Sequence, residues 1–226
     1  MTVIEIGCMG VRPGLDVMND NTPEGEVLPT AYNTVTVTPG GPYNAFWGLQ
    51  LEDPTKVWTF FEFDSVEAHM EFGRLHGAEI VKDLPSILTF GFMKHLALTS
   101  SAPMAFKSPL TEIIFVHFPS DTSGDKQEEF TEQLSATLSS MASMCPKIRA
   151  VSWGWGVEND FPFLGQEEHA GLVFAAALGW EGVAEQQEFT SDPVCRNFEA
   201  TGRSISGVAG LSKVRVSLRG SERKME

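Results

Sequence analysis

The sequence predicts an α+β protein made of two copies of one unit, each running strand, helix, strand, strand, helix, strand. Three observations support this prediction. Strand-like and helix-like segments follow that order in the first half of the chain and again in the second. A Trp-Gly signature, followed by an acid and then by Asp or Asn, begins at Trp47 and again at Trp153, 106 residues later. The length of 226 residues fits two units of about 100 residues each.

In the first half, strand-like runs alternate with helix starts. Thr22-Pro23-Glu24 predicts a helix start that Gly25 and Pro29 interrupt, so we expect a poorly helical connection over residues 11–42. Asp64-Ser65-Val66-Glu67 has the capping-box pattern and opens the second helix. The expected elements are strands at 2–10, 43–51, 56–63 and 89–98, a helix from 64, and a short helical piece at 79–84.

The second half repeats this order. Its clearest element is a helix over 126–143, where Phe130, Leu134, Leu138 and Met141 recur at helical spacing. A long loop around Pro162 joins two strands. The remaining expected elements are strands at 110–118, 148–157, 169–178 and 208–218, a helical region from 180, and a helix over 194–200 after the start signal Asp192-Pro193.

Such a unit is the ferredoxin-like split βαβ, an antiparallel sheet with helices on one face. The free face of each sheet needs a cover, so we expect two tandem ferredoxin-like βαββαβ repeats packed sheet to sheet as a pseudo-dimeric α+β barrel. The repeats would cover residues 1–106 and 107–226. A tandem chain satisfies its own sheets, which allows a monomer, and edge pairing allows a homodimer.

The composition excludes several classes of protein. Sixteen Lys and Arg against 30 Asp and Glu give a net charge of −14, which argues against nucleic acid as a partner. The chain has no run of about 18 apolar residues, so no membrane span is predicted. The first residues are expected to form a strand and not a signal peptide. Three scattered cysteines indicate neither a disulfide framework nor a zinc site, so we expect a cytoplasmic protein.

The run Val57–Phe72, in which an aromatic strand leads into Asp64-Ser65-Val66-Glu67, resembles the dimeric α+β barrel superfamily. Leu178–Val183 leading to Phe189 is a weaker echo in the second half. The family includes antibiotic-biosynthesis monooxygenases, polyketide cyclases and stress-responsive barrel proteins. A tandem, acidic chain of this size most resembles members from fungal secondary metabolism.

The resemblance implies a cofactor-independent enzyme acting on a hydrophobic small molecule held between a sheet and its helices. The implied reactions are polyketide-like cyclisation, isomerisation, dehydration or cofactor-free oxygenation. The alternative is a non-catalytic small-molecule-binding or stress-responsive barrel protein. Phe72 stands where the cyclases carry a tyrosine, and His76 lies about two residues from the position of their histidine.

Histidines are the default acid–base candidates because they titrate near neutral pH. His76 is either catalytic or a helix-end residue that favours the helix dipole. His117 is either a base or a core residue among apolar neighbours. His69 is expected to be exposed, and His169 to lie at the rim. The predicted catalytic residues are His76, His95, His117, Glu62 and Tyr43.

Strand alternation places Glu62 on one face with Trp58 and Phe60. We interpret Glu62 either as an acid–base group whose pKa burial would raise or as a hydrogen-bond anchor. Glu5 and Glu112 both lie in first strands and are interpreted as repeat-related partners. The aromatic strands are either core or the wall of a ligand cavity. The predicted substrate-binding residues are Trp47, Trp58, Thr59, Phe61 and Phe72.

No histidine pair has metal-ligand spacing with an acid nearby, and neither a dinucleotide nor a phosphate loop is present, so no metal and no cofactor are predicted. Haem held by one axial histidine remains an open alternative. Because the first connection is expected to be irregular, we predict that the first half holds the ligand.

Overall fold

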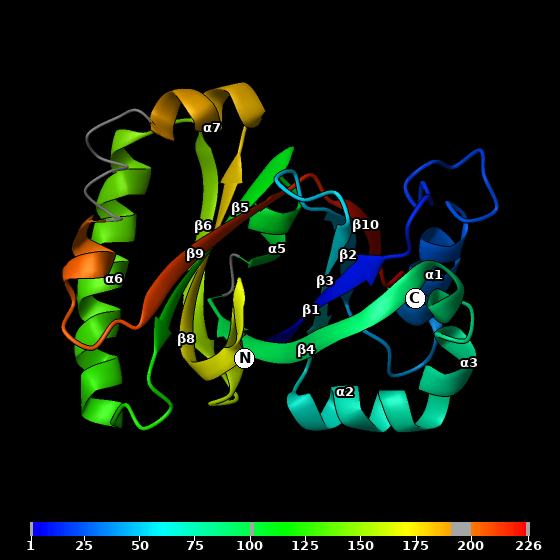
Figure 1. Ribbon diagram of the computed structural model, residues 1–226, viewed down its shortest axis with the longest axis horizontal. Coiled ribbons are helices and arrows are strands. Elements are labelled where there is room, and N and C mark those ends of the chain that lie inside the picture. Colours follow the sequence, from blue (N-terminus) through cyan, green and yellow to red (C-terminus); the bar gives the residue numbers. More distant parts are fainter. Residues whose placement is uncertain (1, 100–101, 191–199, 225–226) are drawn as a thin grey trace. The chain divides into compact units, whose positions relative to one another are not determined.

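The computed structural model describes residues 2–99, 102–190 and 200–224 (Figure 1). The chain divides into two compact units. Unit 1 consists of residues 1–95 together with 216–226, and unit 2 consists of residues 96–215. The predicted repeat boundary at 106/107 stays a prediction. The compact units are divided at 95/96, and the chain returns to unit 1 at residue 216.

The sheet of unit 1 has the strand order β10-β2-β3-β1-β4. Strand β3 pairs antiparallel with β1 and β2, and β10 pairs antiparallel with β2. The strands are β1 (Val3–Val11), β2 (Asn44–Leu49), β3 (Lys56–Phe63), β4 (Leu88–Leu98, in unit 1 as far as His95) and β10 (Arg219–Glu222).

Helices cover one face of this sheet. The main one is α1, in which Leu28, Ala31, Tyr32 and Val35 are buried. Pro29 lies in the first turn of α1, where no intrahelical hydrogen bond is lost, so it does not interrupt the helix. The connection expected to be poorly helical is therefore helical over 11 residues. The helices are α1 (Val27–Val37), α2 (Val66–Phe72), the π-helix η1 (Gly73–Gly77), α3 (Ala78–Ile80) and α4 (Leu84–Ile87).

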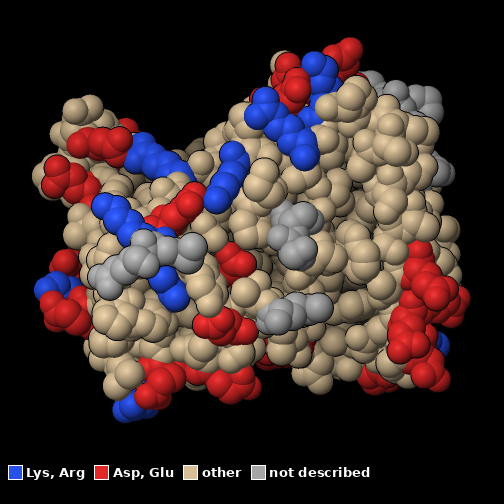
Figure 2. Space-filling model, turned by 180° about the vertical axis from the view of Figure 1, so that it is seen from behind, with Lys and Arg blue, Asp and Glu red and all other residues tan. Residues whose placement is uncertain are grey.

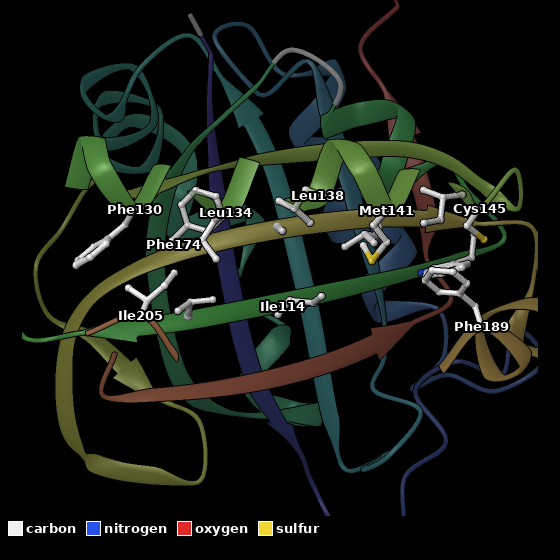
Figure 3. Packing of buried hydrophobic residues seen from close by; sticks show 14 of the residues in the cluster. Ile114, Phe130, Leu134, Leu138, Met141, Cys145, Phe174, Phe189 and Ile205 are labelled. Carbon is white, nitrogen blue, oxygen red and sulfur yellow. The ribbon is translucent and has the colours of Figure 1, made fainter. Parts of the chain in front are cut away.

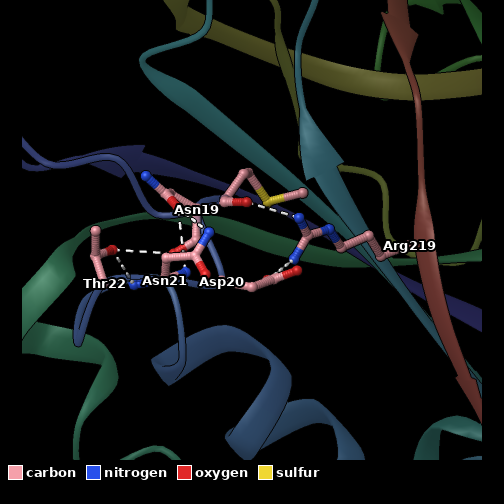
Figure 4. A network of polar contacts seen from close by, with 7 residues as sticks. Asn19, Asp20, Asn21, Thr22 and Arg219 are labelled. Atoms are coloured by element: carbon pink, nitrogen blue, oxygen red, sulfur yellow. Dashed lines mark hydrogen bonds and ion pairs between the residues drawn. The ribbon is translucent and has the colours of Figure 1, made fainter.

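The loop before α1 is fixed by a polar network (Figure 4). Asn19 and Thr22 close its turns, with Gly25 N donating to Thr22 Oγ1 over 3.2 Å. Arg219 donates to the Asp20 carboxylate and, over 2.6 Å, to the Met18 carbonyl. Residues near the C-terminus therefore hold in place the segment that leads into α1.

Unit 2 has the same spatial order of equivalent strands, β6-β8-β5-β9, with the end of β4 beside β6 and the short β7 beside β8. Strand β5 pairs antiparallel with β8 along its full length. The elements are α5 (Ala102–Phe106), β5 (Leu110–Phe118), α6 (Gly124–Met144), β6 (Ile148–Gly156), β7 (Phe161–Phe163), β8 (Gln166–Trp180), α7 (Val183–Thr190) and β9 (Gly210–Val216).

Helix α6 packs on the sheet of unit 2 through the predicted stripe (Figure 3). Phe130, Leu134, Leu138 and Met141 point toward the strands that carry Ile114 and Phe174. The outer face of α6 is exposed and carries Asp125, Glu128, Glu129 and Glu132. Acidic groups are also spread, with basic ones between them, over the face seen in Figure 2.

The predicted α+β fold with two tandem ferredoxin-like units is therefore confirmed. Packing of the two sheets face to face as a closed barrel stays a prediction. Four short elements, α4, α5, β7 and β10, were not predicted. The strand expected over 208–218 is shorter, at 210–216, and β10 follows it. The helix start predicted at Asp192-Pro193 lies outside the described residues.

Candidate functional site

The site is centred on Glu5, which β1 directs toward the helices of unit 1. Along β1, Val3 and Met9 pack against the cluster formed with α1, so Glu5 shares their face by alternation. Directly opposite Glu5 on β3 is Phe61. Glu5 is only 5% exposed, and burial raises the pKa of its carboxyl to about 8.

His69 reaches Glu5 from α2. The helix begins after Ser65, whose side chain accepts a hydrogen bond from Ala68 N at 3.2 Å. One turn later His69 points back to the sheet, with Nε2 3.1 Å from Glu5 Oε2. Its ring lies 5.0 Å from that of Phe63. The predicted exposure of His69 is wrong, since its side chain is 17% exposed.

His95, on β4, completes a chain of three titratable groups. Its Nε2 lies 2.8 Å from His69 Nδ1, and it is 6% exposed. We call Glu5, His69 and His95 the acid–histidine chain. Each link is within hydrogen-bond distance, so a proton can pass from one end to the other as the ring nitrogens exchange donor and acceptor roles.

Two further polar groups lie in the same layer. Tyr32 packs its ring 5.4 Å from Trp47 and 5.1 Å from Phe61. Tyr32 Oη and Trp47 Nε1 are buried and have no hydrogen-bond partner among the described residues. Burial, followed by the charge of Glu5, raises the pKa of Tyr32, so its hydroxyl stays protonated and can donate.

A cavity of about 680 Å³ lies on the other side of α1. Ala31 and Ile87 belong both to its wall and to the apolar cluster that contains Tyr32 and Trp47. The rest of its wall consists of acidic, apolar and hydroxyl side chains, and its one basic residue, Lys82, is paired with Glu79 at 2.6 Å. The lining residues come from the loop before α1, from α1 and from α3–α4: Leu15, Pro23, Glu24, Glu26, Val27, Thr30, Ala31, Thr34, Glu79, Ile80, Lys82, Asp83, Ser86 and Ile87.

Glu62 and Tyr43 are not brought to this chain. Glu62 alternates with Phe61 and so faces the side of the sheet opposite Glu5. It accepts hydrogen bonds from Thr2 Oγ1 at 2.9 Å and Asn44 Nδ2 at 2.6 Å, which favours the anchor interpretation. Tyr43 donates to Asp64 at 2.7 Å, and this bond, with the charge of Asp64, raises the pKa of the phenol.

The other predicted residues of the first half divide between the two faces. Thr59, Phe61 and Phe72 are buried on the helix side with Trp47, whereas Trp58 faces the other way and donates from Nε1 to Gln50 Oε1 at 3.0 Å. His76 lies on η1, with its ring 5.3 Å from Phe72 and partly exposed.

His117 is buried in unit 2 among aromatic rings, the nearest being Phe163 at 4.5 Å. Its Nε2 lies 3.1 Å from Ser212 Oγ, and Nδ1 is buried without a partner among the described residues. Burial lowers the pKa of His117 to about 4, which keeps the ring neutral. This environment supports the core interpretation. His169 is exposed, as expected.

Unit 2 has a counterpart of the acid–histidine chain. Glu112 lies opposite Leu178 on β8 as Glu5 lies opposite Phe61 on β3. Gln186 occupies the place of His69 and donates from Nε2 to Glu112 Oε1 at 3.0 Å. Arg215 Nη1 donates to Gln186 Oε1 at 2.9 Å, in the place of His95. We call Glu112, Gln186 and Arg215 the acid–amide chain.

In the part of the chain that the structure describes, no group of three or more His, Cys, Asp or Glu side chains is arranged to hold a metal ion. None of the described helices is long and apolar enough to span a membrane.

Comparison with known proteins shows the fold. No family model matches the chain, and no curated protein matches its sequence. Among solved structures, a candidate monooxygenase from Lactobacillus acidophilus NCFM matches with a TM-score of 0.61 at 10% identity, over 98% of this chain and 96% of the other. A candidate monooxygenase from Fusobacterium nucleatum subsp. nucleatum matches with a TM-score of 0.63 at 9% identity, over 98% and 94%.

An anthrone oxidase-like protein matches with a TM-score of 0.62 at 13% identity, over 99% of this chain and 93% of the other. These matches cover both units. They show that the fold of both units occurs in these solved structures. At these identities they assign no residue a role.

The site residues predicted from the sequence include His95 and Trp47 but not Glu5, His69 or Tyr32. One signal for Glu5 was present, since it is the only acid in a strand whose other inward positions are apolar or glycine. His69 follows the Ser65 cap by four residues, one turn into the helix, and this spacing could have placed it against the sheet. Tyr32 lay in the connection expected to be irregular.

Proposed function

We propose that the protein is a cofactor-independent enzyme that removes a proton from a neutral, hydrophobic small molecule in unit 1. The observation that supports this best is the acid–histidine chain, in which a buried carboxyl contacts two linked histidines. The reactions predicted from the sequence, cyclisation, isomerisation, dehydration and cofactor-free oxygenation, can all begin with such a proton transfer. The specific reaction belongs to this proposal.

Glu5 acts as the base. Its carboxylate forms in an apolar layer where charge is poorly solvated, so it binds a proton more strongly than an exposed carboxylate does. A general base works best when its pKa lies near the operating pH, and a pKa of about 8 meets that condition.

The histidines then hold the proton that Glu5 receives. When Glu5 donates to His69 Nε2, His69 Nδ1–H can donate to His95 Nε2. The proton thus moves from Glu5 toward β4 without a change of backbone. Return along the same path would deliver it to another atom of the substrate, as an isomerisation or a dehydration requires.

The cavity beside α1 suits the body of such a molecule. Its volume of about 680 Å³ lies within the usual range of small-molecule sites. Glu24, Glu26 and Asp83 in its wall repel anions, and Lys82 is already paired. We therefore propose a neutral substrate without a phosphate or carboxylate group. A cytoplasmic location and a monomeric or homodimeric state remain predictions.

Exchange of carbon-bound hydrogen for deuterium tests this proposal. Anthrone, 2-tetralone and acetylacetone, three neutral carbon acids, are incubated with the protein in D₂O and followed by NMR. We expect faster exchange than in buffer for at least one of them. The rate should rise with pH and level off above about 8, where Glu5 is ionised.

Glu5→Gln should lower the protein-dependent exchange by about 100-fold or more. The matched control is Glu112→Gln, which removes the equivalent carboxylate of unit 2 and should leave exchange unchanged. Equal rates for the wild-type protein and Glu5→Gln would refute the proposal. Binding of these compounds without any exchange would favour the alternative, a non-catalytic small-molecule carrier.

A further inference from the structure

We infer that Tyr32 Oη and Trp47 Nε1 form an oxygen-binding pair, so that the substrate carries a carbonyl or enol oxygen beside the carbon that loses its proton. This inference rests on the proposed function, because it names the chemical class of molecule that would meet Glu5. It adds two substrate-contacting residues, one on α1 and one on β2.

The hydroxyl of Tyr32 and the indole N–H of Trp47 are both buried. Both side chains are 3% exposed, and their polar atoms have no hydrogen-bond partner among the described residues. A buried donor without an acceptor is unfavourable, and a structure rarely keeps two in contact with each other. The indole N–H can only donate, and the phenol of Tyr32 stays protonated because burial raises its pKa. Both atoms therefore offer a hydrogen to an acceptor.

Tyr32 and Trp47 belong to the layer that also contains Glu5 and Phe61. Tyr32 lies over Trp47 and Phe61, with ring centroids 5.4 and 5.1 Å apart. Phe61 is the direct cross-strand neighbour of Glu5. Strand β3 therefore separates Trp47 on β2 from Glu5 on β1, and the charge of Glu5 contributes to the raised pKa of the Tyr32 phenol.

The two donors suit proton removal next to a carbonyl group. When a base removes a proton next to a carbonyl, negative charge moves onto the oxygen. Fixed donors aimed at that oxygen stabilise the charge in a site from which water is excluded. A base and two donors in one apolar layer are the parts that enolisation requires. The cavity lies next to this layer, since Ala31 and Ile87 belong both to its wall and to the cluster that contains Tyr32 and Trp47.

The test uses a ligand that cannot react. 9-Fluorenone has a carbonyl and no hydrogen on the neighbouring carbons that could be removed, whereas fluorene has the same tricyclic shape without the oxygen. We expect fluorenone to bind the wild-type protein about tenfold more tightly, as one or two additional hydrogen bonds would provide. With ¹³C in its carbonyl, fluorenone should also show a downfield carbonyl shift on binding, because donors polarise the C=O bond.

Tyr32→Phe and Trp47→Phe should each reduce both the preference for fluorenone and the carbonyl shift. Tyr43→Phe and Trp153→Phe are the matched controls and should change neither. Equal affinities of the wild-type protein for the two compounds would overturn the inference, and this comparison needs no variant to fold. A carbonyl shift that survives in both Tyr32→Phe and Trp47→Phe would also overturn it.

Failure of this inference differs from failure of the proposed function. Fluorenone binding with the expected shift, but no deuterium exchange of the three carbon acids, would reject the enzyme and keep the oxygen-binding pair. Exchange that depends on Glu5, without the shift, would keep the enzyme and reject the pair.

Discussion

The acid–histidine chain of unit 1 and the acid–amide chain of unit 2 are built on the same positions of the same fold. In each, a buried glutamate on the first strand contacts a residue in the first turn of the helix that follows β3 or β8. That residue in turn contacts a side chain on β4 or β9. Unit 1 has two titratable rings at the second and third positions. Unit 2 has an amide and a guanidinium.

The two chains share their hydrogen bonds but differ in whether the second residue can carry a proton. Gln186 supplies the same hydrogen bond to its glutamate as His69, but an amide neither gains nor loses a proton near neutral pH. Burial raises the pKa of Glu112, while the charges of Lys213 and Arg215 oppose this shift. For Glu5, burial is the cause of the raised pKa. We therefore expect the acid–amide chain of unit 2 to serve the fold and not proton transfer.

Replacing His69 by glutamine, the residue at the equivalent place in unit 2, should have the largest effect on activity. His69→Gln gives unit 1 the amide of unit 2, which can still donate to Glu5 but cannot carry a proton onward. We expect proton exchange on the responsive carbon acid to fall by about 10²–10⁴-fold with a small change in stability. NMR exchange rates and urea unfolding measure the two effects.

Gln186→His is the reciprocal control and should leave the exchange rate unchanged. If His69→Gln retained full activity, or if Gln186→His removed it, the assignment of chemistry to unit 1 would be wrong.

The pH dependence of stability should distinguish the two glutamates next. Between pH 4.5 and about 8 the folded protein holds a proton on Glu5 that the unfolded chain releases, so Glu5 lowers stability as pH rises. Relative to the wild-type protein, Glu5→Gln should gain about 3–5 kcal/mol in unfolding free energy over that range. Urea unfolding at several pH values measures this. A constant difference between the two proteins would show that Glu5 titrates normally.

His117 provides a somewhat smaller effect in the opposite direction. Its folded-state pKa of about 4 lies below the ordinary 6.5, so the unfolded chain binds the extra proton as pH falls. Stability should therefore decline by about 3 kcal/mol between pH 6.5 and 4, and His117→Phe should remove this decline. The variant should keep its exchange activity. A loss of activity would mean that unit 2 also contributes a proton-transfer group.

The smallest expected effect compares two helix starts. Ser65 caps α2 with its side chain, whereas Ser123 precedes α6 without a side-chain capping bond. Ser65→Ala should cost about 1 kcal/mol in unfolding free energy and slow exchange slightly, because His69 lies one turn away. Ser123→Ala should cost almost nothing. Equal losses in thermal unfolding would contradict this account of α2.

Local signals predicted much of the fold. The stripe on α6 and the cap at Ser65 are formed by residues close in sequence, and both elements were predicted near their observed positions. The helical content of α1 was underestimated because a proline breaks a helix only beyond the first turn. Pro29 lies within the first turn of α1. The short strand β10 escaped notice because its pairing depends on β2, far away in the sequence.

The site was harder to predict for a geometric reason. Alternation along β3 sorts Phe61 and Glu62 onto opposite faces, but it does not say which face the helices cover. We selected Glu62, whereas the helices cover the face of Phe61 and Glu5. The links from Glu5 to His69 and from His69 to His95 depend on tertiary packing, which no spacing rule contains.

The return of residues 216–226 to unit 1 has a consequence for synthesis. A ribosome releases residues 1–95 first, yet β10 and the contacts of Arg219 with Asp20 and Met18 become available only at the end. The hydrogen bond between Thr36 Oγ1 on α1 and Ser221 Oγ, 2.9 Å apart in the folded protein, likewise forms only after Ser221 has been synthesised. All of unit 2 emerges in between. The nascent chain thus assembles its inserted unit before it can complete the unit that holds Glu5.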